Sequence, residues 1–305
     1  MTDSMRYRVH KPSPPLSGFV DYVWYVSDAP GHARERIVPS GTVELVINLH
    51  EDEFRIYGSA ATGEGCRRFR GAIVSGCYGA PFAIDTREHA SVIGVHFRPG
   101  GAVGLLGAPP GELADTHVSL DELWGRRATE LRERLCAAAE LRQRFQILQH
   151  ALIARLPHTP PGRGAVSAAL SRLDQPGVKV GEVTKAFGLS RRRFVEIFTE
   201  DVGMTPKRYG RVRRFQRALA LAFESPSPAW AQLALECGYF DQAHLCRDWA
   251  EFTGFSPGVL LAMRGTRVKD HLLALPGEGS NLSNTPPASA RTLYANGGDD
   301  APRET

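Results

Sequence analysis

The sequence has few cysteines, and none of them is spaced for a metal site. The five cysteines are scattered among 305 residues, are odd in number and include no Cys-x-x-Cys pair, which argues against a disulfide scaffold or a thiolate zinc site. No His-x-His pair suggests a cupin-like metal site. The N-terminus has no apolar core of signal-peptide length, and no run approaches the roughly 18 apolar residues of a transmembrane helix. We therefore expect a soluble, cytoplasmic protein with no metal and no cofactor.

Positive charge is concentrated in one part of the chain. The formal net charge is only +4 at pH 7, but residues 179–217 hold eleven Lys or Arg against four Asp or Glu. Such an excess favours an anionic partner. Charge alone leaves open the alternative that these residues form a solvated helix face.

Short runs typical of β-strands dominate the first part of the chain. They are YVWYV, VELVINL, EFRIY, GAIVSG and SVIGVHF, at 22–26, 43–49, 53–57, 71–76 and 91–97. Gly and Pro separate the runs without a crossover helix of useful length, which favours a mostly antiparallel sheet or small barrel. Within 43–49, Leu45, Ile47 and Leu49 alternate with more polar residues, which predicts a strand with one buried side.

The periodicity becomes helical after residue 119. Apolar residues recur at three- and four-residue steps in 121–135, which follows the N-cap candidate Ser119, and in 140–156. These two helices could cover the sheet or form a dimer seam. The predicted class is α+β with two domains. Its parts are a mostly antiparallel β-rich domain at 1–119, a helical pair at 120–157, a linker at 158–164, an all-α domain at 165–264 and a disordered tail at 275–305.

A pentapeptide typical of the end of one helix and the start of the next occurs twice, as VGMTP at 202–206 and TGFSP at 253–257. In each copy a short helical segment ends at a glycine, Gly188 or Gly238, and a second helix follows at once. This order is that of a helix-turn-helix, whose second helix can enter the DNA major groove. A long helix at 206–223 joins the copies and would place them on successive grooves if it spans about one DNA turn, roughly 34 Å.

The outward positions of the two second helices supply the candidate DNA contacts. Arg suits guanine edges, Gln suits adenine, and Glu can accept a hydrogen bond from the amine of cytosine. Basic residues and helix N-terminal amides can hold phosphates. The predicted DNA-binding residues are Arg191, Arg192, Val195, Glu196, Thr199, Arg208, Arg211, Gln242, Ala243, Cys246 and Arg247.

Residues 178–261 resemble the DNA-binding domain of the AraC/XylS family of bacterial transcription regulators. The second motif of that family follows the pattern A-x-x-x-G-[FY]-x-D-x-x-[HY]-[FL]-x-R-x-[FW]-x-x-x-x-G-x-S-P. Two positions depart from common family choices: Glu196, where many members have a basic or other polar residue, and Trp249, where Phe is commoner. The matching residues here are Ala234, Gly238, Tyr239, Asp241, His244, Leu245, Arg247, Trp249, Gly254, Ser256 and Pro257.

The front half resembles the sensor domain of a subgroup of these regulators, in the segments WYV, VPSGTVELVINL, GVHFRPGGA and LDELWG. Members often carry Pro-Asp-Gly where this chain has Pro39-Ser40-Gly41. Tyr22, Trp24 and Tyr78 either line an effector cavity or belong to the core. The Arg of HFRPGGA, at 96–102, either holds an anionic ligand or marks a tight strand exit.

We expect a sequence-specific DNA-binding transcription regulator rather than an enzyme. Double-stranded DNA is the expected partner. An unknown small-molecule effector, RNA polymerase and a second copy of the chain are further candidates, and no membrane is involved. The alternative is a DNA-binding half fused to an enzymatic or partner-binding N-terminal module. A repair methyl-acceptor would need a cysteine metal cluster and an amidase-like module a nucleophile elbow, and the sequence contains neither pattern.

Overall fold

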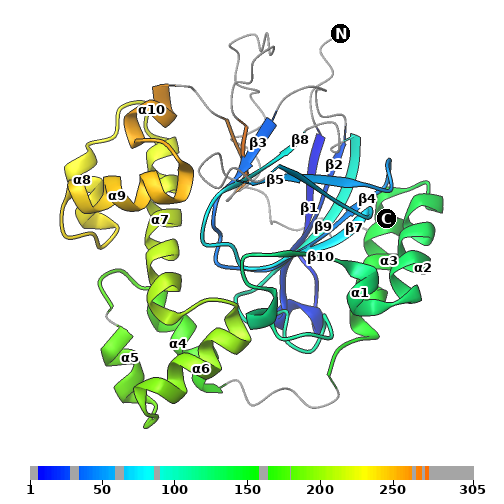
Figure 1. Cartoon of the computed structure of the whole chain (residues 1–305), viewed down its shortest axis with the longest axis horizontal. Coiled ribbons are helices and arrows are strands. Elements are labelled where there is room, and N and C mark those ends of the chain that lie inside the picture. The colour runs from blue at the N-terminus through cyan, green and yellow to red at the C-terminus, as the bar shows by residue number, and fades with distance from the viewer. Residues whose placement is uncertain are drawn as a thin grey trace, which may run out of the picture.

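The computed structural model describes residues 6–27, 34–58, 65–85, 90–157, 164–178, 180–262, 266–269 and 272–274. An N-terminal β part is followed by a C-terminal helical part that stands beside it (Figure 1). The predicted α+β class, with an antiparallel β domain and an all-α domain, is therefore confirmed. The predicted tail at 275–305 and all but the last residue of the predicted linker lie outside the described residues.

Two sheets form the N-terminal part. One has the strand order β1-β2-β9-β4-β7-β10 and the other β11-β12-β3-β8-β5-β6. Every pairing among the described strands is antiparallel. The strands are β1 (Arg6–His10), β2 (Val20–Ser27), β3 (Arg34–Ile37), β4 (Glu44–Asn48), β5 (Phe54–Tyr57), β6 (Cys66–Phe69), β7 (Ala72–Ser75), β8 (Phe82–Asp85), β9 (Ser91–Phe97), β10 (His117–Ser119), β11 (Thr266–Lys269) and β12 (Leu272–Ala274).

Strands β11 and β12 come from the end of the chain, after the helical part. β12 pairs with β3, with Leu273 opposite Arg36. The sequence predicted no element at these positions, because strands of four and three residues carry too little periodicity to be recognised. The chain thus returns to the N-terminal part and extends its second sheet.

Strand β4 lies in the middle of the first sheet and is buried on both faces. Leu45 and Ile47 are fully buried in a core that the sheet shares with the helices. Val46 points the other way, against a second apolar cluster that draws residues from both sheets. The prediction of a single buried side for 43–49 is therefore wrong, because the second sheet covers the face that would otherwise meet solvent.

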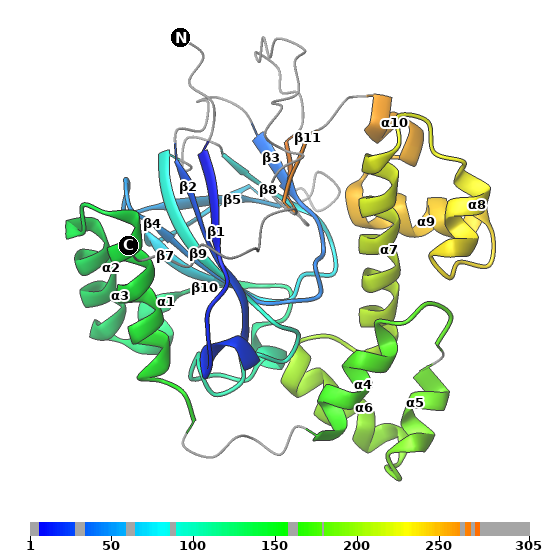
Figure 2. The ribbon, with the colours of Figure 1, turned by 180° about the vertical axis from the view of Figure 1, so that it is seen from behind.

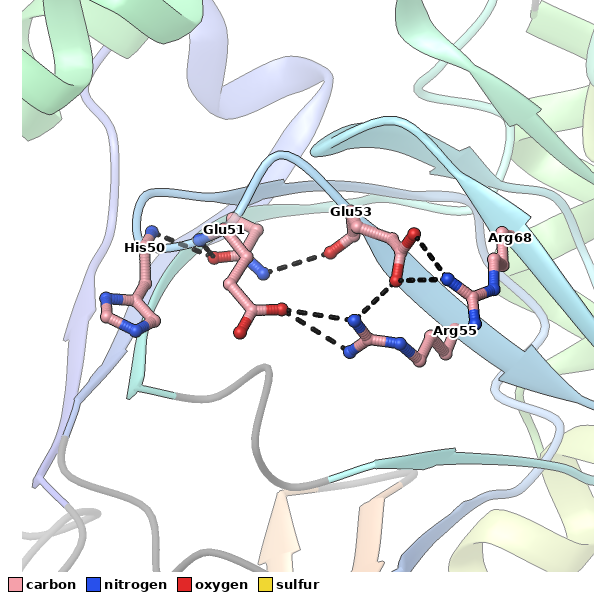
Figure 3. Close-up of polar contacts among 6 residues, drawn as sticks. His50, Glu51, Glu53, Arg55 and Arg68 are labelled. Atoms are coloured by element: carbon pink, nitrogen blue, oxygen red, sulfur yellow. Dashed lines mark hydrogen bonds and ion pairs between the residues drawn. The ribbon is translucent and has the colours of Figure 1, made fainter.

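The turn between β4 and β5 is held by Asn48, which is fully buried. Its Oδ1 accepts two backbone N–H groups of the turn at 2.9 and 3.0 Å, and its Nδ2 donates to the carbonyl of Glu53 at 3.1 Å. The carboxylates of Glu51 and Glu53 pair with Arg55, and Glu53 also reaches Arg68 on β6 (Figure 3). These ion pairs are accessible to solvent, so each stabilises the sheet only slightly.

A helical layer covers the outer face of the first sheet (Figures 1 and 2). The predicted helical pair is confirmed in its covering role, but the helix expected at 121–135 is broken at Gly125, whose φ of 58° suits glycine. The backbone N–H of Ser119 donates to Glu122 at 3.3 Å, as expected at a helix start. The layer consists of α1 (Leu120–Trp124), α2 (Arg126–Ala137) and α3 (Leu141–Ile153). Two short 3-10 helices lie elsewhere in this part of the chain, at η1 (Leu16–Gly18) and η3 (Pro110–Leu113).

Seven helices follow in the described residues after 157. Both predicted helix-turn-helix pairs are present, as α5 with α6 and α8 with α9, and α7 joins them. No helix in the described ranges is long and apolar enough to cross a membrane. The helices are α4 (Gly164–Leu173), α5 (Val180–Ala186), α6 (Arg191–Val202), α7 (Pro206–Glu224), α8 (Trp230–Glu236), α9 (Gln242–Thr253) and α10 (Pro257–Ala262).

The repeated pentapeptide marks the same junction twice. Gly203 and Gly254 have φ values of 89° and 79° and end α6 and α9 in the left-handed conformation. Pro206 and Pro257 then open α7 and α10, where a missing N–H costs no helical hydrogen bond. The hydroxyl of Thr205 accepts the N–H of Arg208 at 3.3 Å and caps α7.

Gly94 of β9 provides a test of the second apolar cluster. A Cβ at Gly94 would lie 2.3 Å from Cε2 of Trp24, which is buried in that cluster. Gly94→Ala should lower the free energy of unfolding by about 1–3 kcal/mol through overpacking, measured by urea unfolding followed by tryptophan fluorescence. Gly65→Ala, with no heavy atom within 4 Å of the added carbon, is the control and should change it by less than about 0.5 kcal/mol. An unchanged midpoint for Gly94→Ala would contradict this packing.

Candidate nucleic-acid interface

The second helices of the two helix-turn-helix pairs lie toward opposite ends of α7 (Figures 1 and 2). α7 has 19 residues, so its axis is roughly 28 Å long at about 1.5 Å per residue. This length is of the same order as one turn of DNA, about 34 Å. One rigid helix therefore sets the separation of α6 and α9.

Each second helix is anchored by apolar side chains and leaves its other face outside the core. Phe194 and Phe198 of α6 are buried, and so are Leu245, Trp249 and Phe252 of α9, as the sequence predicted. Nine of the eleven predicted DNA-binding residues therefore lie on the faces left over, and Arg208 and Arg211 lie on α7. Among them, Arg191, Arg192, Glu196, Gln242, Ala243 and Arg247 are exposed, whereas Val195, Thr199 and Cys246 are half-buried.

The arginines at the start of α6 are paired with a glutamate of the same helix. Arg192 Nε lies 2.9 Å from Glu196 Oε1, and Arg193 Nη1 lies 3.6 Å from Glu196 Oε2. All three side chains are well exposed, so solvent screens these pairs and they are weak. A phosphate or a base edge can replace Glu196 as partner at little cost.

The outer side of α6 approaches the N-terminal part. Val195, Glu196, Thr199 and Glu200 line a groove whose other wall is formed by residues 109–112. The two backbones come so close that a Cβ on Gly111 would lie 2.9 Å from the carbonyl oxygen of Thr199. The Thr199 hydroxyl oxygen is buried with no hydrogen-bond partner. Two of the predicted base contacts, Val195 and Thr199, are thus partly covered in this arrangement.

Arg208, near the start of α7, also contacts the N-terminal part. Its Nη1 lies 3.7 Å from Asp115 Oδ2. Its guanidinium lies so close to Gly79 that a Cβ there would come within 1.9 Å of Arg208 Cζ. The side chain is 39% exposed, so the pair is weak and Arg208 can exchange Asp115 for a phosphate.

Arg211 connects α7 to α9. It donates to Asp248 Oδ1 at 2.7 Å and to Glu251 Oε2 at 2.5 Å. The hydrogen bond to Glu251, with a further contribution from Asp248, raises the pKa of the Arg211 guanidinium above its usual value. Because the Asp248 side chain is only 4% exposed, loss of Arg211 would leave a buried carboxylate with weaker compensation. Arg211 therefore has a structural role beside any phosphate contact.

The N-terminus of α9 is open to solvent. Asp241 caps it by accepting the N–H of His244 at 2.6 Å, and Gln242, Ala243 and Arg247 follow on the exposed side. Burial raises the pKa of the Cys246 thiol, so this side chain is a neutral, small apolar surface rather than a thiolate. Such a surface suits contact with a thymine methyl group.

Phe240 is a candidate contact that the sequence analysis missed. It directly precedes the capping residue of α9 and is 86% exposed. A large aromatic side chain in that position contributes little to the core and is suited to contact with thymine methyl groups. The sequence held a signal for this contact. In the family pattern, position 240 can be any residue, although it lies between the specified positions that Tyr239 and Asp241 match.

The N-terminal part holds a separate cavity. Trp24 and Tyr78 line it, whereas Tyr22 stacks on the His96 ring at 4.7 Å. Arg98 donates through Nε to the carbonyl of Ser17 at 2.8 Å, as a tight strand exit requires. The cavity, rather than the segment 96–102, is therefore the candidate effector site.

Two parts of the chain match models of known protein families. Residues 183–263 match the family model of a helix-turn-helix domain, and residues 8–119 match a domain of unknown function, DUF6597. An uncharacterized HTH-type transcriptional regulator of Haemophilus influenzae is 31% identical over 93 residues, which cover 30% of this chain and 31% of that protein. The chain thus spans less than a third of that relative's length.

Solved structures that the comparison found similar to this chain include ToxT from Vibrio cholerae. One ToxT structure has a TM-score of 0.42 at 9% identity and covers 85% of this chain and 98% of that chain. Another, with a bound unsaturated fatty acid, has a TM-score of 0.43 at 7% identity and covers 85% and 95%. The xylose-binding transcription activator xylR has a TM-score of 0.28 at 19% identity over 47% of this chain and 39% of that chain.

Proposed function

We propose that the chain is a sequence-specific DNA-binding transcription regulator of the AraC/XylS kind, a proposal supported by the match of residues 183–263 to the helix-turn-helix family model. The observation that carries this proposal is the pair of helix-turn-helix units joined by α7, each with an exposed basic or polar helix start. The chain would bind its DNA target in the cytoplasm, without a catalytic step or a cofactor.

The exposed residues of α6 and α9 would supply sequence discrimination. Arg192 and Arg247 can each hydrogen-bond a guanine, and Gln242 can hydrogen-bond an adenine. Arg191 and Arg208, together with the open N-termini of the two helices, would hold phosphates and supply salt-dependent affinity. RNA polymerase and a second copy of the chain remain candidate partners for the same regulator.

The present arrangement would hold the helical part docked on the N-terminal part. Gln216 of α7 donates to the carbonyl of Pro39 at 2.6 Å, Arg36 donates to that of Thr253 at 3.0 Å, and the Cys77 thiol donates to that of Val202 at 2.8 Å. With Val195 and Thr199 facing residues 109–112, α6 would have to separate from this loop before entering a major groove. A small molecule in the N-terminal part could then regulate DNA binding by shifting the docked and undocked populations.

Titration of the full chain against fragments of its own genome, at several salt concentrations, tests the proposal. We expect one or a few fragments to bind at least about 10³-fold more tightly than the rest at physiological salt. The affinity should fall linearly with salt on logarithmic axes, by a slope of about 0.9 per phosphate contact. Equal, weak binding to every fragment would reject a sequence-specific regulator and favour the partner-binding alternative.

Three arginine variants separate base contacts from structural ones. Arg192→Ala and Arg247→Ala should each weaken binding to the preferred fragment by about 1–3 kcal/mol and relax discrimination between fragments. Arg211→Ala is the matched control. It should lower the free energy of unfolding by about 1–3 kcal/mol, because buried Asp248 would keep only the longer contact with Arg214 at 3.9 Å, while leaving discrimination unchanged. Unaltered discrimination in the first two variants would reject their assignment as base contacts.

Gly111→Ala tests whether docking limits DNA binding. The added carbon would meet the backbone of α6 at Thr199 and Glu200, so the variant should loosen the docked state. We expect about three- to tenfold tighter binding to the preferred fragment, measured by fluorescence anisotropy, which corresponds to about 0.7–1.4 kcal/mol. Gly18→Ala, with no heavy atom within 4 Å, should leave the affinity unchanged. Unchanged or weaker binding by a folded Gly111→Ala variant would show that this contact does not restrain α6.

A further inference from the structure

The two helix-turn-helix units contact each other directly, in addition to their connection through α7. The first unit is α4 to α6, and the second is α8 to α10. Gly238 lies in the turn between α8 and α9 and has a φ of 83°. A Cβ on Gly238 would lie 2.9 Å from the backbone nitrogen of Gly177, in the segment between α4 and α5. The turn of the second unit is therefore packed against the backbone of the first.

Arg217 of α7 bridges the two sides of this contact. Its Nη2 donates to the carbonyl of Asp174, which directly follows α4. Its Nη1 donates at 3.3 Å to the carbonyl of Cys237, the C-terminal cap of α8. The last carbonyls of a helix have no partner within it and carry partial negative charge, so a cation there is favourable. One guanidinium thus holds the ends of two helices that belong to different units.

The side chain of Asp174 attaches the same segment to α7. Its Oδ1 accepts from Tyr209 Oη at 2.9 Å and from Arg213 Nε at 2.8 Å. Tyr209 is fully buried, and burial, followed by the charge of Asp174, raises the pKa of its phenol well above the usual value, so it remains a donor at physiological pH. Tyr209, Arg213 and Arg217 follow at four-residue steps and form one stripe along α7. This stripe fixes the end of α4.

The bridge supplies a constraint that α7 alone does not. A helix sets the length between two units, but each unit attached to it separately can still tilt relative to the other. Arg211 illustrates such a separate attachment, because it joins α7 to α9 within the second unit. Arg217 and the contact of 174–177 with 237–238 instead connect the two units to each other beside α7. A second connection of this kind removes the relative tilt.

We propose that Arg217 is a positioning residue that sets the spacing between the two half-sites recognised on DNA, without contacting DNA itself. This inference rests on the proposed regulator function and extends it from the identity of the bases to the distance between them. One inserted base pair displaces a half-site by about 3.4 Å and rotates it by roughly 35°. Units that are bridged to each other cannot follow this displacement, so α6 and α9 no longer reach their base edges together.

The bridge depends on a guanidinium rather than on positive charge. Arg presents its donors in a fixed planar fork, whereas Lys carries one compact ammonium group. Arg217→Lys therefore keeps a positive charge at this position but cannot hold both carbonyls in the same geometry. Arg217→Ala removes the charge as well. The two substitutions together separate a bridge between units from a phosphate contact.

A series of DNA fragments tests the role of Arg217. Footprinting with the full chain first locates the half-sites in the preferred fragment, and one or two base pairs are then inserted or removed between them. Wild-type affinity should fall at least about 30-fold for a change of one base pair, because one unit loses its base contacts. In Arg217→Ala and Arg217→Lys this spacing penalty should shrink to less than about fivefold, with at most about threefold weaker binding at the original spacing.

A purely stabilising role of Arg217 predicts a different result. Its loss would then weaken binding to every fragment by the same factor and leave the spacing penalty unchanged. That outcome in a variant that is folded by circular dichroism would overturn the proposal, and so would full retention of the penalty by Arg217→Lys. Arg144→Ala is the matched control in the N-terminal part, since Arg144 donates to the carbonyl of Ala138 at 3.0 Å and to Tyr25 Oη at 3.1 Å. It should leave the spacing penalty unchanged.

The turn glycines of the two units provide a second test. Gly188 and Gly238 have φ values of 64° and 83°, so alanine strains both turns in the same way. A Cβ on Gly238 meets the backbone at Gly177, whereas a Cβ on Gly188 has no heavy atom of the described residues within 4 Å. Gly238→Ala should therefore separate the units and reduce the spacing penalty, and Gly188→Ala should not. Equal penalties in the two folded variants would overturn the role of this contact.

Hydrogen exchange without DNA tests the bridge independently of the regulator function. The amides of Gln175 and Tyr239 lie beside the bridged carbonyls and donate within their own units at 3.0 and 2.9 Å. Both should exchange at least about tenfold faster in Arg217→Ala than in wild type, and at the wild-type rate in Arg144→Ala. Unchanged exchange at both amides in Arg217→Ala would overturn the bridge.

The two measurements distinguish failure of this inference from failure of the regulator proposal. Sequence-specific binding with the same spacing penalty in wild type and Arg217→Ala would overturn the positioning role and leave the regulator proposal standing. Faster exchange in Arg217→Ala, in a chain that prefers no DNA fragment, would reject the regulator proposal and the spacing role with it, and would leave a bridge that only stabilises the helical part.

Discussion

Helix α7 is buried on two sides at once, and this double burial fixes the positions of both DNA-binding units. Phe215 and Leu219 are fully buried within the core of the helical part, and Phe215 packs on Trp249 of α9. On another side, Gln216 donates to the Pro39 carbonyl, and Tyr209 lies against Gly41. Any movement of the loop that contains Pro39 and Gly41 must therefore also move α7. Because α7 also sets the distance between α6 and α9, the N-terminal part can influence both of them through one element.

The arginines of the helical part fall into two energetic groups. Arg192 and Arg208 pair with Glu196 and Asp115 at exposed positions, where such pairs contribute about 0–1 kcal/mol and are screened by salt. Arg211 instead holds a carboxylate, Asp248, that is almost fully buried, and its loss would be costly. A DNA phosphate can compete for the first group but not readily for the second. The positive charge that the sequence concentrates in this region is consequently divided between residues that can contact DNA and residues that maintain the framework on which they stand.

The sequence predicted the elements that depend on neighbouring residues. The glycine–proline repeat identified the ends of α6 and α9, and the apolar periodicity identified Phe194, Phe198, Leu245 and Trp249 as buried, because helix ends and helix faces are set within a few residues. It could not predict the covering of Val195 and Thr199, since docking joins residues 125 to 217 positions apart, such as Cys77 with Val202 and Arg36 with Thr253. It also missed the second buried face of β4, because alternation within one strand carries no information about another sheet. The predicted DNA contacts and domain boundaries stay predictions.

The cavity lined by Trp24 and Tyr78 and the DNA-binding helices meet at residues 38–42 and 76–77, and this shared wall limits how a ligand can act. A ligand shifts an equilibrium only by the difference between its affinities for the two states. The docked state fixes the Pro39 carbonyl on Gln216, and the cavity wall beside it is therefore part of the docked geometry. A molecule that fits this wall as it stands favours docking and weakens DNA binding, whereas one that must push Pro39 or Gly76 outward favours release of α6. Linkage then requires DNA to change the affinity for that molecule by the same factor, so the shape of the ligand, more than its chemical class, sets the sign of regulation.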